Sequence, residues 1–384
     1  RRVHGEILAM WKPRSLNIFP AFGTPFNTNY IYPPGTPSAN ITCFAMPYER
    51  ELDAAKKATT LAARLCQKVQ RTLLKSDVQS KSDRSPVTIA DYGSQAIISI
   101  VLQQEFSSEK FSLVAEEDAK DLREDNAKEA VLKITSLVNN TLENDPPLTS
   151  GSILSAIDCG NSEGGPSGRH WVLDPIDGTK GFVRGDQYAI ALALLDEGKV
   201  VLGVLACPNL PANSDLSSGE ETGCLFYAVA GSGTSVESLT GSNPRKAEVT
   251  AIGNPKEASF FESYEAAHSQ HGLSKTICSK LGVEVPPVRM DSQVKYGALS
   301  RGDGAIFMRF PYKGYREKIW DHAAGYIVVQ EAGGLVLDAA GNDLDFSNGA
   351  YLDVDTGIIS TNKKLMPSLL QAVKEALQEQ RSNI

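Results

Sequence analysis

One eleven-residue run constrains the fold of this chain more than any other. Residues 171–181 read WVLDPIDGTKG, an apolar stretch typical of a buried strand that ends in two carboxylates three residues apart. Pro175 fixes the backbone between Asp174 and Asp177, which favours both side chains pointing at one place. The pair can supply oxygen ligands to a hard cation such as Mg²⁺, and the Ile176 carbonyl is placed to add a third. The run therefore predicts a metal site at the end of a strand.

The residues that follow add a place for phosphate. Gly178 and Thr179 read as the start of a helix, where backbone N–H groups without helical partners favour an anion. Metal and phosphate would then lie side by side, as phosphoester hydrolysis requires. A DPID string is by itself more typical of a surface turn. Its attachment to an apolar strand favours the functional interpretation.

Further carboxylates follow other short apolar stretches. Glu116 and Glu117 come after residues 111–115, and Asp321 comes after Ile319-Trp320. An acidic triplet alone is usually a solvated surface feature. Because each of these acids follows an apolar stretch, we expect it at a strand end or a helix start. Asp91 precedes an apolar helical pattern and could cap that helix, which leaves room for a second role.

Three motifs in this order resemble the magnesium-dependent, lithium-sensitive phosphatase superfamily that includes inositol monophosphatase and fructose-1,6-bisphosphatase. They lie at residues 115–118, 174–179 and 320–325. Within that superfamily, the segments at 259–263, 268–271 and 291–296 are most similar to the 3′(2′),5′-bisphosphate nucleotidases of the plant and fungal type. The resemblance runs from about Tyr48 to about Leu369, with no departure at a metal-ligand position.

The resemblance implies a metal centre and a mechanism. Two or three Mg²⁺ ions would be held by Glu116, Asp174, the Ile176 carbonyl, Asp177 and Asp321. Without cations, four acids in one cleft would repel one another and raise their pKa values. Glu116 would help to activate water, and Thr179, held by Asp91, would orient it. Direct in-line attack on phosphorus is then expected, without a covalent enzyme intermediate.

The resemblance also implies which residues bind the substrate. They are Gly178, Thr179, His268, Ser292, Lys295, Arg309 and Asp321. An imidazole can stack on adenine, and Lys295 with Arg309 can neutralise a second phosphate. A lone His or Lys is otherwise more often a solvated surface residue. Arg309 is harder to explain in that way, because its strand neighbours are apolar.

The expected reaction releases the 3′-phosphate of adenosine 3′,5′-bisphosphate and leaves AMP. A second expected substrate is 3′-phosphoadenosine 5′-phosphosulfate. One alternative from the same superfamily is an inositol polyphosphate 1-phosphatase that acts on inositol 1,4-bisphosphate. An alternative from another class is a non-catalytic nucleotide sensor, although a degenerate member would be expected to lose a metal ligand.

Composition limits the partners. With 384 residues, 41% of them hydrophobic, the chain can bury a sizeable core. Its net charge of −8 argues against nucleic acid as a partner, whereas bound Mg²⁺ would reverse the local sign for a small anionic nucleotide. No apolar run approaches the length that spans a bilayer. We expect a monomer or homodimer that binds a small-molecule nucleotide bisphosphate.

Hydrophobic periodicity predicts the architecture. Apolar positions spaced by three and four predict helices at 49–74 and 91–106, and a helix within 119–150. A short strand at 111–115 and strands at 170–173, 188–195, 200–206 and 225–230 are expected, the last four suggesting an antiparallel sheet under the two N-terminal helices. Beyond residue 245, strands near 258–261 and 288–291 alternate with helices at 271–281 and 321–332, which favours a mixed or parallel α/β layer. A strand near 357–360 and a helix at 367–380 close the chain.

The predicted fold class is therefore α+β followed by α/β, a layered sandwich of helices and sheets like inositol monophosphatase and fructose-1,6-bisphosphatase. We expect residues 48–245 to form an α+β domain with most metal ligands. Residues 246–384 would form an α/β domain with the nucleotide-binding residues. The site would lie in the cleft between them.

The N-terminal arm differs from the rest. Residues 1–47 contain seven prolines, four Lys or Arg and one acid, Glu6. This composition fits a disordered targeting segment for a plastid or a mitochondrion, with the native start expected before Arg1. Met46 could begin a cytosolic form. An untranslated leader is the alternative interpretation.

The six cysteines show no metal-ligand spacing; they are Cys43, Cys66, Cys159, Cys207, Cys224 and Cys278. Cys207 ends one predicted strand and Cys224 begins the next, so a hairpin would bring their side chains within bonding distance. Closing such a loop would stabilise the chain by about 3 kcal/mol and make a redox switch. Two unpaired structural thiols are the favoured alternative, since intracellular thiols are normally reduced. Cys159 is a separate candidate for an intermolecular contact.

Overall fold

The computed structural model describes residues 47–73, 78–80, 86–212, 222–264, 270–311, 314–354 and 356–382. The predicted targeting segment therefore lies outside the described residues except for Pro47, and so do Met46, Cys43 and His268. Residues 45–384 form one compact unit. The boundary predicted near residue 245 falls within that unit, so the division into two domains stays a prediction.

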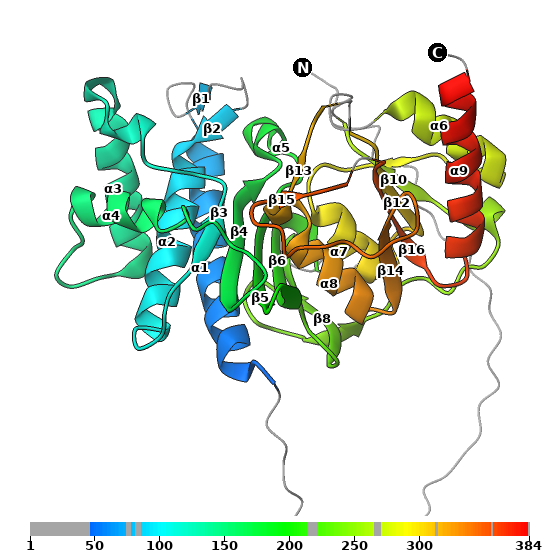
Figure 1. Ribbon diagram of the computed structural model, residues 1–384. Helices are drawn as coiled ribbons and strands as arrows, with labels where there is room; N and C mark the ends of the chain where they lie inside the picture. The colour runs from blue at the N-terminus through cyan, green and yellow to red at the C-terminus, as the bar shows by residue number, and fades with distance from the viewer. Residues whose placement is uncertain are drawn as a thin grey trace, which may run out of the picture. The chain divides into compact units, whose positions relative to one another are not determined.

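Alternating layers of helices and sheets build this unit, as Figure 1 shows. Their order is α3 with α4, α1 with α2, a seven-stranded sheet, α7 with α8, a five-stranded sheet, and α6 with α9. The helices are α1 (Glu49–Thr72), α2 (Ile89–Glu105), α3 (Lys128–Leu142), α4 (Ser150–Asp158), α5 (Thr179–Arg184), α6 (His271–Leu281), α7 (Val294–Ser300), α8 (Ala323–Glu331) and α9 (Met366–Ser382). The predicted layered α+β and α/β sandwich is confirmed.

The large sheet carries the motif that ends in Asp174 and Asp177. In spatial order its strands are β3 (Leu113–Ala115), β4 (Arg169–Asp177), β5 (Ala189–Asp196), β6 (Lys199–Pro211), β7 (Thr222–Val229), β8 (Gly233–Ser238) and β9 (Arg245–Ala247). Only the β3–β4 pair is parallel among these neighbours. The antiparallel sheet predicted beneath the N-terminal helices is thus present.

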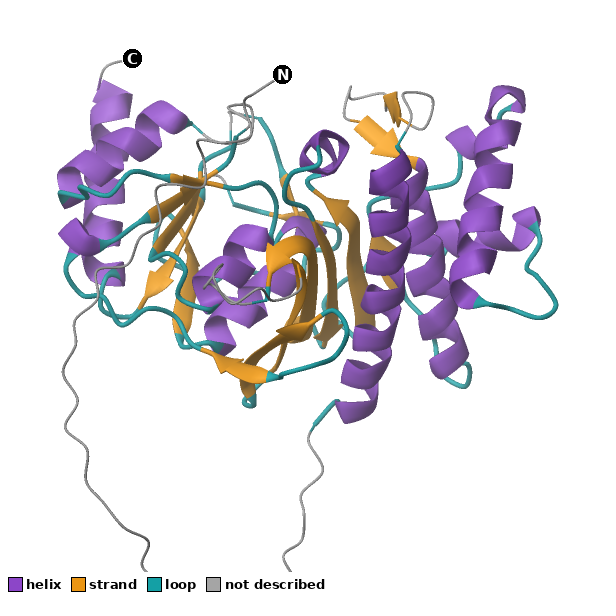
Figure 2. Ribbon diagram, turned by 180° about the vertical axis from the view of Figure 1, so that it is seen from behind, coloured by secondary structure: helices purple, strands orange, loops and turns teal. Residues whose placement is uncertain are grey.

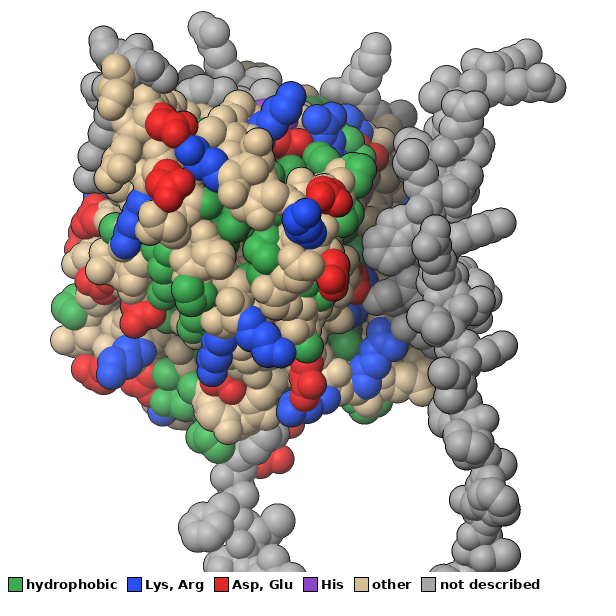
Figure 3. Space-filling view, turned by 90° about the vertical axis from the view of Figure 1, so that its right-hand side faces the viewer, with side chains coloured by type: hydrophobic (Ala, Val, Ile, Leu, Met, Phe, Trp, Pro, Cys, Tyr) green, Lys and Arg blue, Asp and Glu red, His purple; other side chains and the backbone are tan. Residues whose placement is uncertain are grey.

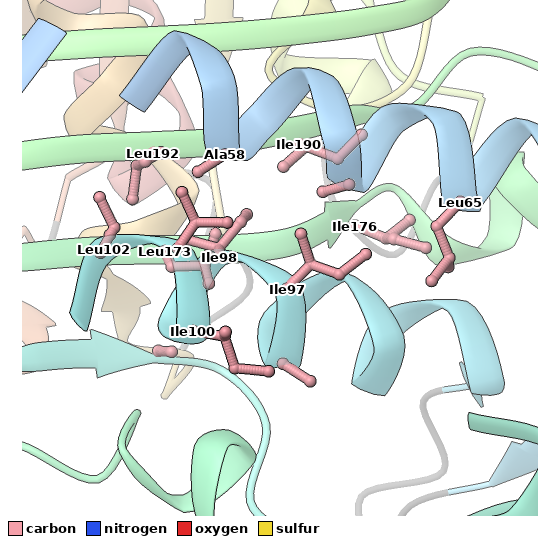
Figure 4. Packing of buried hydrophobic residues seen from close by; sticks show 14 of the residues in the cluster. Ala58, Leu65, Ile97, Ile98, Ile100, Leu102, Leu173, Ile176, Ile190 and Leu192 are labelled. Carbon is pink, nitrogen blue, oxygen red and sulfur yellow. The ribbon is translucent and has the colours of Figure 1, made fainter. Parts of the chain in front are cut away.

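Helices α1 and α2 cover one face of this sheet. Ala58 and Leu65 of α1 meet Ile97 and Ile98 of α2 above sheet residues such as Leu173 (Figure 4). Helix α2 is buried on almost every side, because α1 and the sheet cover part of it and α3 and α4 cover the rest. Its apolar residues therefore surround the helix instead of forming one stripe.

The second sheet mixes parallel and antiparallel pairs. Its strands in spatial order are β11 (Val288–Arg289), β10 (Phe260–Glu262), β12 (Ile306–Arg309), β16 (Ile358–Asn362) and β14 (Gly334–Asp338). Strand β10 runs parallel to both neighbours, and β16 runs antiparallel to both of its own. Figure 2 shows both sheets from behind, with helices on either side. Two short pairs complete the strands: β1 (Val78–Ser80) with β2 (Pro86–Thr88), and β13 (Glu317–Lys318) with β15 (Tyr351–Leu352).

Helices α7 and α8 fill the space between the sheets, and two glycines permit their close packing. A Cβ atom on Gly325 of α8 would lie 2.2 Å from the Tyr296 ring of α7. A Cβ atom on Gly203 of β6 would lie 2.7 Å from the Ala324 carbonyl. The small residues at 323–325 therefore let the helix that follows Asp321 lie against its neighbours.

The elements missing from the sequence-based prediction are mostly short. They include α4, α7, β8, β9 and β14, whereas the strand expected around Arg309 is present as β12. Short buried segments carry too few residues to show a periodicity. The predicted helix at 321–332 also begins later, at Ala323, because residues 319–321 form a 3₁₀ turn.

The predicted absence of a nucleic-acid partner stays a prediction. On the face shown in Figure 3, Lys and Arg side chains are interspersed with Asp and Glu, so the described side chains there form no continuous basic surface. No helix among the described residues is long and apolar enough to cross a membrane.

Candidate active site

A β-bulge brings the two carboxylates of the DPID sequence to one face of the sheet. Asp174 lies opposite Ala191 of β5, whereas Asp177 lies opposite Ala189, so two residues of β4 face one residue of β5 between these pairs. Side chains alternate along a regular strand, and residues three apart would point to opposite faces. The extra residue of the bulge restores a common face for Asp174 and Asp177.

The core confirms this change of alternation. Leu173 and Ile176 are also three residues apart, and both pack in the cluster beneath α1 and α2 (Figure 4). Val172, two residues before Asp174, packs in the cluster on the opposite face, with α7 and α8. The carboxylates therefore face the layer that contains Trp320 and Asp321.

Hydrogen bonds hold the bulge in place. Ser94 of α2 donates to the Pro175 carbonyl over 2.8 Å, and the Ile176 N–H donates to Asp174 Oδ1 over 3.1 Å. The Ile176 carbonyl accepts the Thr179 hydroxyl at 3.2 Å. A carbonyl oxygen has two lone pairs, so its predicted role as a metal ligand stays open.

Asp91 has both of the roles considered from the sequence. Its Oδ2 accepts from the backbone N–H and the hydroxyl of Thr88, at 2.8 and 2.7 Å, as the third-residue partner in a capping box at the start of α2. Its Oδ1 lies 3.2 Å from the Thr179 hydroxyl. The helix cap thus fixes the carboxylate that holds Thr179.

The structure gathers the four predicted acidic ligands in one region. Asp174 is only 2% exposed, and its pKa is raised well above the usual range by burial and then by Glu116, Asp177 and Asp321. Burial also raises the pKa of Asp321, with Glu317, Asp177 and Glu116 adding to the effect against Arg309. Such mutual effects require proximity. Asp174 is buried and the other three acids are part-buried, and such a group of carboxylate oxygens fits Mg²⁺, because a divalent cation offsets their repulsion.

One of the four acids, Asp321, also belongs to a tighter group. Ligand atoms of Glu317, Asp321 and His322 lie within 4.8 Å of one another, the one such trio found among the described acidic, His and Cys residues. Glu317 accepts from Arg309 Nε at 2.7 Å and from His322 Nε2 at 3.1 Å. Burial alone would raise the pKa of Glu317, but Arg309 and His322 lower it to about 2. Since Arg309 and His322 already balance the charge of Glu317, we interpret Glu317 as part of a buried ion-pair network with these two residues, and Asp321 as the member of the trio that is left for a cation.

The predicted substrate-binding residues Gly178 and Ser292 come together. Gly178 has φ +91°, and a Cβ atom on it would lie 2.9 Å from the Ser292 Cβ. Ser292 itself has φ +65°, a strained conformation for a residue with a side chain. The loop after β11 is therefore held against the turn after β4, and this contact leaves no room for a side chain at position 178.

Lys295 and Arg309, the two basic side chains predicted to bind phosphate, both donate hydrogen bonds to acceptors within the protein. Lys295 is 4% exposed and donates to the Met290 carbonyl over 3.0 Å. Burial lowers its pKa to about 8, although Asp177 and Asp291 raise it. Arg309 donates to Glu317 and, over 3.3 Å, to Asp321 Oδ2. Their predicted contact with a second phosphate remains a prediction, and His268 lies outside the described residues.

Sequence reasoning missed Gln293, which connects the parts of the site. Its backbone N–H donates to Asp177 Oδ2 over 2.7 Å, and its side-chain amide donates to the Trp320 carbonyl over 2.8 Å. Its Oε1 accepts from the Gly325 N–H at 3.0 Å. The residue lies between Ser292 and Lys295, but an uncharged amide gives no chemical signal in a sequence. Only its contacts reveal that it joins Asp177 to the turn that carries Asp321.

The predicted pair Cys207 and Cys224 lies on neighbouring strands of the large sheet. Cys207 and Cys224 are directly opposite in the β6–β7 pair, and both are buried free thiols on the same sheet face. Burial, followed by the neighbouring Cys224, raises the pKa of the Cys207 thiol. Cys159 is part-buried after α4, where its Sγ lies 2.7 Å from Gln103 Nε2 and 3.2 Å from the Ser155 carbonyl. The disulfide and the intermolecular contact both stay predictions.

If Cys207 and Cys224 form the redox switch, mild oxidation should remove two thiols as a Cys207–Cys224 disulfide and should change the reaction rate; if they are structural thiols, the thiol count and the rate should both stay the same. Directly opposed residues have Cα atoms about 4.5–5.5 Å apart, within the range that a disulfide accepts. Thiol counting before and after oxidation, with activity measured alongside, checks this. If Cys207→Ala shows the same rate difference between oxidised and reduced protein as the parent, this pair is not the switch.

Residues 48–378 of this chain match the sequence model of the inositol monophosphatase family. A 3′(2′),5′-bisphosphate nucleotidase of Oryza sativa is 66% identical over 344 residues, which cover 87% of this chain and 96% of that protein. The 3′(2′),5′-bisphosphate nucleotidase 1 of Arabidopsis thaliana is also 66% identical, over 347 residues that cover 87% and 98% of the two chains.

A solved structure supports the fold. The crystal structure of the extragenic suppressor protein suhB from Bartonella henselae matches with a TM-score of 0.56 and 21% identity. The match covers 84% of this chain and 98% of the other. At this identity the likeness concerns the fold alone, and it agrees with the layered architecture in Figure 1.

Proposed function

Because this chain belongs to the inositol monophosphatase family, we propose that it is a Mg²⁺-dependent 3′(2′),5′-bisphosphate nucleotidase. It hydrolyses the 3′-phosphate of adenosine 3′,5′-bisphosphate and leaves AMP. The observation that carries this proposal is the bulge that turns Asp174 and Asp177 to one face, beside Thr179 and opposite Asp321. The names of the two plant relatives support the choice of substrate.

The metal-holding residues are those predicted from the sequence. Glu116, Asp174, Asp177 and Asp321 would hold two or three cations, with the Ile176 carbonyl as a further oxygen ligand. Bound Mg²⁺ supplies Lewis acidity toward phosphoryl oxygens and lowers the pKa of water. The chain itself contributes a buried, strongly anionic site in which such ions are favoured over bulk solvent.

Thr179 and Asp91 orient the attacking water. The Thr179 hydroxyl directs its proton toward Asp91 Oδ1 or the Ile176 carbonyl. Its oxygen lone pairs then accept a hydrogen bond from water, which places that water for in-line attack on phosphorus. Glu116 helps to activate that water.

The second domain supplies substrate recognition in this proposal. Ser292 packs against Gly178, in the turn that follows Asp177. Lys295 and Arg309 lie close enough to Asp177 to lower its pKa, and they would provide positive charge for the substrate phosphates. His268 would stack on adenine. The same groups would accept 3′-phosphoadenosine 5′-phosphosulfate, because its 5′ end is also anionic.

Phosphate release from a substrate panel tests the proposal. The panel contains adenosine 3′,5′-bisphosphate, 3′-phosphoadenosine 5′-phosphosulfate, inositol 1,4-bisphosphate and inositol 1-phosphate, each with Mg²⁺. We expect the highest kcat/KM for the first compound. Faster hydrolysis of inositol 1,4-bisphosphate would favour the inositol polyphosphate 1-phosphatase. Binding of nucleotide without any phosphate release would favour the sensor.

We propose in addition that residues 1–47 direct the protein to a plastid or a mitochondrion. The composition of the segment supports this, since it has four basic residues and one acid. A fluorescent protein fused behind residues 1–47 should enter one of these organelles. A purely cytosolic signal would contradict the proposal, whereas a second, shorter cytosolic product would fit a start at Met46.

A further inference from the structure

Arg309 is shared between two carboxylates of different function. It ends β12, and its Nε donates to Glu317 Oε1 over 2.7 Å. A terminal nitrogen of the same guanidinium donates to Asp321 Oδ2 over the longer distance of 3.3 Å. Asp321 is a proposed cation ligand, whereas Glu317 has no role in the proposed chemistry. The shorter bond indicates that Glu317 is the main partner of Arg309.

Glu317 is itself fixed by groups behind it. Its side chain is fully buried, and its second oxygen accepts from His322 Nε2 at 3.1 Å. The other ring nitrogen, Nδ1, lies 2.9 Å from the Tyr296 hydroxyl. Because a carboxylate ion can only accept, the imidazole donates through Nε2, and the neutral ring accepts a hydrogen bond from the Tyr296 hydroxyl at Nδ1. This chain of bonds leaves Glu317 little freedom to move.

The arrangement decides where the positive charge of Arg309 lies. A guanidinium prefers a planar, charge-assisted pairing with a carboxylate. If Glu317 lost its charge, Asp321 would be the carboxylate left for Arg309. A guanidinium paired directly with the Asp321 carboxylate would compete with a divalent cation for the same two oxygens.

We propose that Glu317 is a positioning residue that holds Arg309 back from Asp321 and so keeps Asp321 available to a divalent cation. The proposal rests on the proposed function only in taking Asp321 as a cation ligand. It makes no use of the identity of the phosphate ester. Cation affinity is therefore its direct readout.

Mn²⁺ binding to the substrate-free protein, followed by the electron paramagnetic resonance signal of free Mn²⁺, tests the proposal. Glu317→Gln should weaken binding by about tenfold, because one charge-assisted pairing then competes with the cation. Glu317→Asp retains the charge and should recover most of the parent affinity. Equal weakening in both variants would show that volume, and not charge, is what matters at this position.

A double-mutant cycle separates positioning from general electrostatics. Arg309→Gln removes the competitor and should bind Mn²⁺ at least as tightly as the parent. In that background Glu317→Gln should cause little further change. If Glu317→Gln weakens binding equally with and without Arg309, the carboxylate acts directly on the cation and the proposal is wrong. The double variant also removes both members of the Arg309–Glu317 pair, so neither of them stays buried without the other, which protects the test against misfolding of Glu317→Gln alone.

The chain offers a matched control in Arg301 and Asp303. Arg301 is also a mostly buried arginine, and its guanidinium donates to Asp303 Oδ2 and Oδ1. Asp303→Asn removes the same charge from a comparable pair outside the site and should leave Mn²⁺ binding unchanged. A loss there equal to that of Glu317→Gln would mean that net charge explains the result. Failure of the phosphate-release assay with an intact binding cycle would reject the proposed substrate and leave this inference standing.

Discussion

Asp174→Asn is expected to lower kcat for adenosine 3′,5′-bisphosphate by about 10³-fold or more while the protein remains folded. The change replaces a charged oxygen ligand by a neutral amide of almost the same shape. A ligand to a catalytic cation supports several kcal/mol of transition-state stabilisation, and each 1.36 kcal/mol is about tenfold in rate. EDTA should abolish the parent activity in the same assay, and added Mg²⁺ should restore it.

The same variant should be more stable than the parent when cations are absent. The pKa of Asp174 is raised well above its usual value, first by burial and then by Glu116. A group whose folded-state pKa is raised favours folding below its ordinary pKa and opposes it as the pH rises through the folded-state pKa. At neutral pH in EDTA the Asp174 carboxyl group therefore costs stability, and Asn removes that cost. Thermal unfolding at pH 7 should show a higher Tm for Asp174→Asn.

Asp196→Asn provides a control at the other end of the same sheet. Asp196 lies opposite Arg169 at the far end of the β4–β5 pair and bonds to its Nε over 3.0 Å. Its replacement should leave kcat unchanged. A fully active Asp174→Asn protein, or activity that persists in EDTA, would falsify the proposed metal mechanism.

Arg309→Gln is expected to raise KM for adenosine 3′,5′-bisphosphate by about 10–100-fold, with a much smaller effect on inositol 1-phosphate. A hydrogen bond to a charged group is worth about 1.5–3 kcal/mol, and only the bisphosphate has a second phosphate for the guanidinium to contact. Steady-state kinetics with both substrates at saturating Mg²⁺ check this. Saturation matters because Arg309 also contacts Asp321.

Arg301→Gln is the control for this prediction. It removes a buried guanidinium that is bound to Asp303 and to the Pro211 carbonyl, outside the proposed site. Any rise in KM should be small and alike for the two substrates. If Arg309→Gln raised KM equally for both substrates, Arg309 would not contact the second phosphate. The substrate would then have to be recognised elsewhere.

The parts of this protein that the sequence predicts are those in which local chemistry and periodicity agree. The helix predicted at 271–281 has the bounds His271–Leu281, and the four central strands appear within a few residues of their predicted ranges. The acidic motifs, each placed after an apolar stretch, do lie at the ends of buried elements. Contacts between residues close in sequence set these features, so a linear pattern is enough to find them.

Tertiary structure alone decided how the site is assembled. Asp174 and Asp177 are an odd number of residues apart, and only the pairing of β4 with β5 inserts the bulge that gives them a common face. The role of Gln293 depends on three partners from distant segments, and that of Glu317 depends on how Arg309 divides its donors between two carboxylates. A sequence lists which groups can donate, accept or carry charge. Which of these groups come into contact is decided by the packing of the helix and sheet layers, which brings together residues far apart in the chain. A buried polar group is stable only when that packing gives it a hydrogen-bond partner.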